Sequence, residues 1–165
     1  MLNKSLLIRF VLTILIIVQV IIFDTQPVQA AVDSYVKRYL DAEIPVGIKL
    51  NKQGELKNFS AEDLSEGKQT FAKNCLNCHV GGANLVNPSV SLSLEKLKGA
   101  TPPRDDLNNL VAFLRDPMIY DGSSYTLFCR QITENWMSQQ EVENIAAFIL
   151  RAAQKAPYWG VENVR

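Results

Sequence analysis

Histidine is nearly absent from this chain of 165 residues: His79 is the one example, and three cysteines accompany it. A closed zinc site usually takes four ligands, from two Cys-x-x-Cys pairs or from one pair and a distant pair of histidines. The chain holds one such pair, Cys75 and Cys78, and the remaining cysteine is Cys129. The composition therefore disfavours a zinc site. A thioredoxin-like redox pair is also disfavoured, because it needs a βαβ setting and none is predicted nearby.

The sequence also lacks an apolar run long enough to span a bilayer. The run from Phe10 to Phe23 has 14 residues, against about 20 for a transmembrane helix. Basic residues precede it, and the small-residue ending Val28–Ala30 that follows is typical of a signal-peptidase site. We therefore predict that residues 1–30 are a cleaved signal peptide and that residues 31–165 form one domain. An uncleaved membrane anchor is the alternative.

Neither sign of charge dominates the chain. It has 17 Lys and Arg and 17 Asp and Glu, and loss of residues 1–30 would leave 15 and 16. A nucleic-acid-binding domain is usually strongly basic, so this balance argues against nucleic acid as a partner. No acid–base pair or nucleophile stands beside a recognisable substrate pocket, so no enzymatic activity is predicted. Internal repeats and low-complexity tracts are absent as well.

What the sequence does contain is Cys75-Leu76-Asn77-Cys78-His79, the Cys-x-x-Cys-His attachment signature of a c-type haem. On a helix these three positions share one face, so two thiols can bond the haem vinyl groups while the imidazole reaches the iron. We predict that Cys75 and Cys78 carry one covalent haem c and that His79 is its proximal iron ligand. Export fits this chemistry, because cytochromes of this type are matured outside the cytoplasm.

Hydrophobic periodicity and capping residues predict an all-α domain with one small β-hairpin. The hairpin lies within residues 48–59, around a Gly-containing turn. Capping boxes at Ser60 and Ser138 mark the starts of two helices. The predicted helices cover residues 32–42, 61–74, 92–98, 107–115 and 139–153.

Gly67 lies inside the helix that leads to the haem motif. A glycine there lowers helix stability by about 1 kcal/mol relative to alanine, so its presence indicates a close approach of another helix. The last helix, which carries Ala146 and Ala147, is the predicted neighbour, with Phe71 and Phe148 packed near the crossing. A tolerated surface glycine is the alternative.

The sixth position of the haem iron has four candidate occupants: Cys129, Met118, Met137, or an open or water-filled site. The distal ligand usually comes from the loop before the last helix, and Cys129 lies in the middle of that loop. Met137 directly precedes the cap Ser138, where it is placed to pack as a hydrophobic staple, and Met118 is expected in the core. Position therefore favours Cys129.

Cysteine at this position would have a defined chemical consequence. A thiolate donates charge to ferric iron, stabilises it, and lowers the reduction potential. The adjacent Arg130 would help to hold Cys129 in the thiolate form. A buried small hydrophobic residue is the alternative role for Cys129.

The spacing of Gly67, Phe71 and the haem motif, together with the last helix, resembles the class I cytochrome c pattern. More narrowly, the run Thr101–Asp105, the helix after it and Tyr120–Gly122 resemble cytochrome c-550, the extrinsic low-potential cytochrome of cyanobacterial photosystem II. The resemblance implies a class I cytochrome c domain in the thylakoid lumen, peripheral to the membrane after signal cleavage. It implies lumenal photosystem II subunits or a soluble redox protein as partners.

The chain departs from that family at the second iron ligand. The family uses histidine on both sides of the iron, whereas the loop 123–130 has none and carries Cys129 near the expected place. We therefore predict a divergent, cytochrome c-550-like paralogue that acts as a low-potential one-electron carrier. A gas or redox sensor with a displaceable Cys129, and a structural subunit of photosystem II, are the alternatives.

Overall fold

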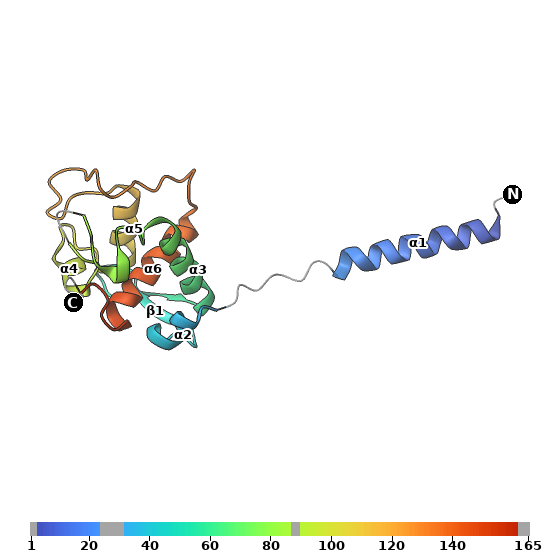
Figure 1. Cartoon of the computed structure of the whole chain (residues 1–165), viewed down its shortest axis with the longest axis horizontal. Helices are drawn as coiled ribbons and strands as arrows, with labels where there is room; N and C mark the ends of the chain where they lie inside the picture. The colour runs from blue at the N-terminus through green and yellow to red at the C-terminus, as the bar shows by residue number, and fades with distance from the viewer. Residues whose placement is uncertain (1–2, 24–31, 87–89, 162–165) are drawn as a thin grey trace. The chain divides into compact units, whose positions relative to one another are not determined.

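The computed structural model describes residues 3–23, 32–86 and 90–161 of the chain, and these fall into two compact units, residues 1–30 and 31–165 (Figure 1). The first unit contains helix α1 (Lys4–Phe23). None of the helices within the described ranges is both long and apolar enough to cross a membrane. The predicted cleavage site, Val28–Ala30, lies outside the described residues, so cleavage stays a prediction.

The second unit is mostly helical, with a two-stranded antiparallel sheet, which confirms the predicted fold class. The element bounds agree closely with the sequence-based ones, except that the first helix of this unit covers Ser34–Leu40 and not the predicted residues 32–42. It ends at Leu40 because Asp41 adopts a left-handed conformation, with φ of 52°. The elements are α2 (Ser34–Leu40), β1 (Val46–Lys49), β2 (Leu56–Phe59), α3 (Ala61–Asn74), the short 3-10 helix η1 (Val80–Gly82), α4 (Leu94–Gly99), α5 (Leu107–Arg115) and α6 (Gln139–Lys155).

Both capping boxes form as predicted. The Ser60 side chain accepts from the backbone N–H of Asp63, whose carboxylate accepts in return from the backbone N–H of Ser60. Ser138 and Glu141 make the same exchange at the start of α6. Each box satisfies N–H groups that the helix itself leaves without partners. These local bonds set where the two principal helices begin.

Helices α3 and α6 cross at Gly67, as the sequence predicted. A Cβ on Gly67 would overlap the backbone carbonyl oxygen of Asn144 in α6, so only glycine permits this approach. Beyond the crossing, the rings of Phe71 and Phe148 lie with centroids 5.5 Å apart. In Figure 1, α6 runs between α3 and α5. The crossing holds the C-terminal end of α3, and with it the haem motif, against the rest of the domain.

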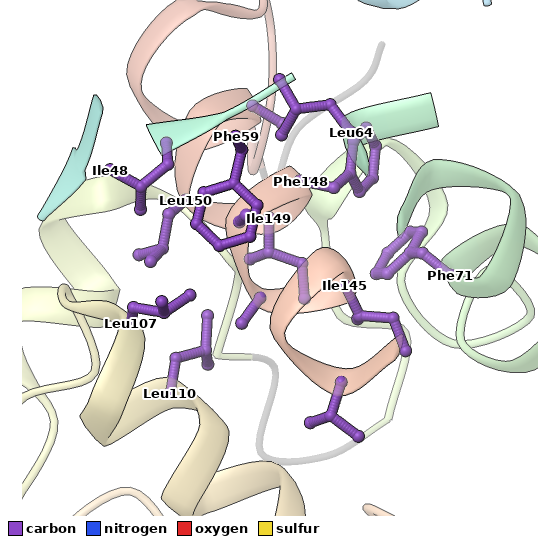
Figure 2. Close-up of a cluster of buried hydrophobic side chains, with 14 of the residues drawn as sticks. Ile48, Phe59, Leu64, Phe71, Leu107, Leu110, Ile145, Phe148, Ile149 and Leu150 are labelled. Atoms are coloured by element: carbon purple, nitrogen blue, oxygen red, sulfur yellow. The ribbon is translucent and has the colours of Figure 1, made fainter. Parts of the chain in front are cut away.

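The hydrophobic core is arranged around α6. Figure 2 shows its side chains gathered with those of the hairpin, α3 and α5. Burying aliphatic and aromatic side chains of this size stabilises the fold by about 1.5–3 kcal/mol each. The labelled core residues, all exposed by 3% or less, are Ile48, Phe59, Leu64, Phe71, Leu107, Leu110, Ile145, Phe148, Ile149 and Leu150.

Candidate haem-binding site

The Cys-x-x-Cys-His motif lies in a hydrogen-bonded turn directly after α3. The sequence had predicted that the motif lies on the helix itself. Cys75 is the C-cap of α3. The backbone N–H groups of Cys78 and His79 both donate to the carbonyl oxygen of Cys75, at 3.1 and 3.0 Å. The second bond has the i to i−4 spacing of one helical turn. The two thiols and the imidazole are therefore held in one tight turn although the helix has ended.

The imidazole of His79 is held by a carbonyl group four residues ahead. Its Nδ1 lies 3.2 Å from the backbone oxygen of Ala83. A carbonyl oxygen only accepts, so Nδ1 must carry the proton and donate, which leaves Nε2 with its lone pair. Burial lowers the pKa of His79, with the bond to Ala83 opposing that change. A neutral ring with a free Nε2 is the form that binds a metal.

A cavity of about 320 Å³ lies beside this turn, and Cys78, His79 and Cys129 all border it. Its remaining walls come from α4, α5 and the loops before and after them. Most of the lining is apolar: Val86, Val90, Leu92, Leu97, Ala100, Leu110, Phe113, Met118, Ile119, Leu127 and Phe128. Two of these lining residues, Leu127 and Phe128, are nonetheless 97% and 63% exposed. Such a cavity suits a flat, largely apolar ligand that would cover them.

Burial makes two of the three thiols harder to deprotonate. Burial raises the pKa of Cys75 to about 11, and the charges of Cys129 and Cys78 contribute in the same direction. Burial also raises the pKa of Cys129, Arg104 lowers it, and Cys78 raises it again. Cys129 borders the same cavity as Cys78, although it is more than 50 residues away in the sequence. The structure thus brings Cys78, His79 and Cys129 to one cavity, with Cys75 in the adjacent turn.

The two methionines considered as iron ligands fall in different environments. Met137 is buried in the hydrophobic core with 5% exposure, as expected for a residue that packs against the start of α6. Met118, which we expected in the core, is instead half-buried and borders the cavity. Its backbone pairs with Tyr125 in an isolated β-bridge, which turns this segment along the cavity wall. Cys129 and Met118 are therefore the two sulfur candidates that border the cavity.

Arg104 is a residue of this site that the sequence reading missed. It is 9% exposed and borders the cavity. Its Nη2 donates to the carbonyl oxygens of Met118 and Ile119, at 3.0 and 2.8 Å, and its guanidinium lies 3.9 Å from the ring centroid of Phe113. Its buried Nε has no hydrogen-bond partner within the described part of the chain. The one feature of the sequence that could have indicated Arg104 is that it is a charged residue directly after two prolines.

These features fit haem c. An apolar cavity bordered by the motif suits the macrocycle, and a buried guanidinium with an unpaired N–H suits the anionic groups at a haem edge. His79 borders the cavity, and with Nδ1 bound to the Ala83 carbonyl oxygen its Nε2 is the nitrogen that could bind the iron. The thiols of the motif are held in the adjacent turn.

Solved structures and known proteins resemble this chain over most of its length. The PsbV2 cytochrome from Thermosynechococcus elongatus superimposes with a TM-score of 0.78 at 54% identity, covering 79% of this chain and all of that one. Cytochrome c549 has a TM-score of 0.60 at 30% identity, covering 66% of this chain and 90% of its own. Photosystem II extrinsic protein V of Gloeobacter violaceus is 47% identical over 137 residues, 83% of this chain and 74% of its own.

The fold and the site together define a class I c-type cytochrome, whose cofactor is haem c. A family model of the cytochrome c-550 domain matches residues 39–165. A cytochrome c-550-like protein of Thermosynechococcus vestitus is 54% identical over 134 residues, 81% of this chain and 77% of its own length. The chain belongs to the cytochrome c-550 family. The family resemblance, the fold class and the cofactor predicted from the sequence are confirmed.

Proposed function

We propose that this protein is a low-potential one-electron carrier whose haem iron is held by His79 and Cys129. When bound, the haem supplies reversible one-electron exchange at its iron. In this proposal Cys75 and Cys78 form the two thioether bonds, and Nε2 of His79 binds the iron. The observation that carries the proposal is that Cys129 and His79 border the same cavity.

Burial and Cys78 leave the pKa of Cys129 raised in the protein alone, so a thiolate there would depend on its bond to the iron and on a nearby cation. Arg104 lowers the pKa of Cys129 by its charge, against the effect of burial. Arg130, which the sequence suggested for this role, has its guanidinium 4.2 Å from the ring centroid of Trp136. A thiolate stabilises ferric iron more than ferrous iron, so it lowers the reduction potential. Arg104 is therefore the cation that we assign to Cys129.

The test compares wild-type holoprotein with Cys129→Ser and Cys129→Met by absorption spectroscopy, EPR and potentiometry. We expect both variants to lose the wild-type ferric low-spin spectrum, and we expect Cys129→Met to have a higher reduction potential. The matched control is Met118→Leu, which changes the other sulfur that borders the cavity and should keep the spectrum. If both Cys129 variants keep the wild-type spectrum, the proposed ligation is wrong.

We further propose that the protein works on the lumenal side of the thylakoid membrane, after loss of residues 1–30. One relative is named photosystem II extrinsic protein V, which supports photosystem II subunits as partners, and a soluble redox protein is the other partner class. Co-purification with photosystem II would favour the first class. Reversible one-electron cycling with unchanged ligation supports the carrier, whereas fast CO binding to the reduced protein would indicate a gas sensor with a displaceable ligand.

A further inference from the structure

The segment after α6 forms hydrogen bonds with two parts of the chain: η1, which follows the haem motif, and the residues just before α4. The indole Nε1 of Trp159 donates to the carbonyl oxygen of Leu92, at 3.0 Å. The backbone N–H of Gly160 donates to the carbonyl oxygen of Gly81, at 2.8 Å. Gly81 lies two residues after His79, and Leu92 lies two residues before α4. The C-terminal segment therefore ties two parts of the site to each other.

The indole ring of Trp159 lies directly against Gly82. A Cβ on Gly82 would be 2.5 Å from Cε2 of that ring, and Gly82 has φ of 79°. Both the close contact and the left-handed conformation require glycine at this position. The carbonyl oxygen of Gly82 in turn accepts from the N–H of Leu92, at 2.7 Å. The ring of Trp159, together with the hydrogen bonds from Gly160 to Gly81 and from Leu92 to Gly82, thus holds η1 in place.

The next residue after this contact is the one that holds His79. Ala83, whose carbonyl oxygen accepts from His79 Nδ1 at 3.2 Å, directly follows Gly82 and is the C-cap of η1. The ring of Phe71 connects the same two side chains. Its centroid lies 5.8 Å from Trp159 and 6.5 Å from His79. Trp159 is therefore linked to His79 through the backbone of η1 and through one aromatic ring.

We propose that Trp159 is a positioning residue for the proximal iron ligand: by packing on Gly82 it fixes the Ala83 carbonyl group that orients the His79 imidazole. The inference rests on the proposed binding of iron by His79. A hydrogen bond from the far nitrogen of a ligating histidine fixes the ring's orientation and raises its basicity as a ligand. Loss of Trp159 weakens that bond, so His79 donates less charge to the iron.

The test uses two variants of the covalent holoprotein. Trp159→Leu removes both the ring contact and the bond to Leu92, whereas Trp159→Phe removes the bond and keeps an aromatic ring. We expect the reduction potential to rise in Trp159→Leu and to rise less in Trp159→Phe, because a weaker histidine donor stabilises ferric iron less. NMR should show faster solvent exchange of the His79 Nδ1 proton in the same order.

Two control variants separate positioning from a general loss of stability. Tyr158→Asn changes the neighbouring residue, which is 85% exposed and has φ of 62°, a conformation that asparagine tolerates. It should leave the potential and the proton exchange unchanged. Leu150→Ala removes a core side chain that is 1% exposed. It should lower the melting temperature without changing either readout.

The inference is overturned if Trp159→Leu lowers the melting temperature as Leu150→Ala does while the potential and the Nδ1 exchange stay at their wild-type values. The proposed function has a separate test in His79→Met. If that variant keeps the wild-type haem spectrum, His79 is not the ligand and the ligation itself is wrong. An unchanged potential in Trp159→Leu, with His79 established as the ligand, overturns only the positioning role.

Discussion

At the scale of single residues, Gly67 shows how one position fixes a helix crossing. Its hydrogen faces the backbone carbonyl of Asn144, and a methyl group there would overlap that oxygen. The neighbour is main chain in the middle of α6, so it cannot rotate away as the end of a long side chain can. The glycine thus lowers the intrinsic stability of α3 and permits the contact that positions the haem motif.

The substitution Gly67→Ala should destabilise the holoprotein although alanine is the better helix former. Helix propensity alone would stabilise the variant by about 1 kcal/mol, whereas overpacking a tight contact costs about 1–3 kcal/mol and more when backbone must move. Chemical denaturation measures the net change. Gln69→Ala, at an exposed position of the same helix, is the control and should change stability by less than about 0.5 kcal/mol. A stabilised Gly67→Ala variant would contradict the close contact.

At the scale of elements, α2 is attached to α3 through one carboxylate. Asp33 caps α2 by accepting from the N–H of Tyr35 at 2.7 Å. Its other oxygen accepts from Lys68 Nζ of α3, also at 2.7 Å. Its own N–H donates to the hydroxyl oxygen of Ser65 at 2.9 Å. These bonds link the first helix of the domain to the one that carries the haem motif.

The contribution of this attachment should depend on pH. Burial raises the pKa of Asp33, but the bonds from Lys68 and Tyr35 outweigh it, so the pKa is lowered in the folded state. A lowered pKa means stability that is present above the unfolded-state pKa and lost as the pH falls through the folded-state value. Asp33→Asn, which can still cap the helix, should cost up to about 1 kcal/mol near neutral pH.

Urea denaturation of both proteins between about pH 7 and pH 2 checks this, because the difference between them should shrink toward zero in acid. Lys68→Gln supplies the matched control, since it removes the partner and leaves the carboxylate. In the Lys68→Gln variant, the stability lost between neutral and acidic pH should be smaller than in the wild type. A difference that stays constant with pH would show that the charge of Asp33 does not stabilise the attachment.

At the scale of the whole molecule, the cofactor and the leader segment make one joint prediction. Expression in a host competent in cytochrome c maturation should yield a red protein that begins at Ala31 and has 135 residues. Its pigment should survive acid–acetone extraction, because thioether bonds to Cys75 and Cys78 are covalent. Intact mass spectrometry and the extracted spectrum check both points.

The matched control replaces Cys75 and Cys78 with alanine together, and acid–acetone should then release any bound pigment. A colourless wild-type preparation would contradict the covalent site. A red protein that still carries residues 1–30 would contradict only the cleavage and would favour the membrane-anchor alternative.

The sequence by itself determined the features that depend on neighbours along the chain. The capping boxes at Ser60 and Ser138 are four-residue patterns, and the structure places both helix starts as predicted. The Cys-x-x-Cys-His motif and the interior Gly67 are equally local. The motif predicted a c-type haem, and Gly67 predicted the helix crossing. Short-range hydrogen bonds and steric limits act within a few residues, so one sequence is enough to predict them.

Only the tertiary structure decided which distant groups meet at the haem cavity. It brought Cys129, Met118 and Arg104 to the border of that cavity and left Met137 in the core. It placed Arg130, which the sequence suggested as the partner of Cys129, over the ring of Trp136. It also placed Trp159 against Gly82, more than 70 residues earlier in the chain. Such contacts depend on how helices pack and where loops return, and local periodicity carries no information about either.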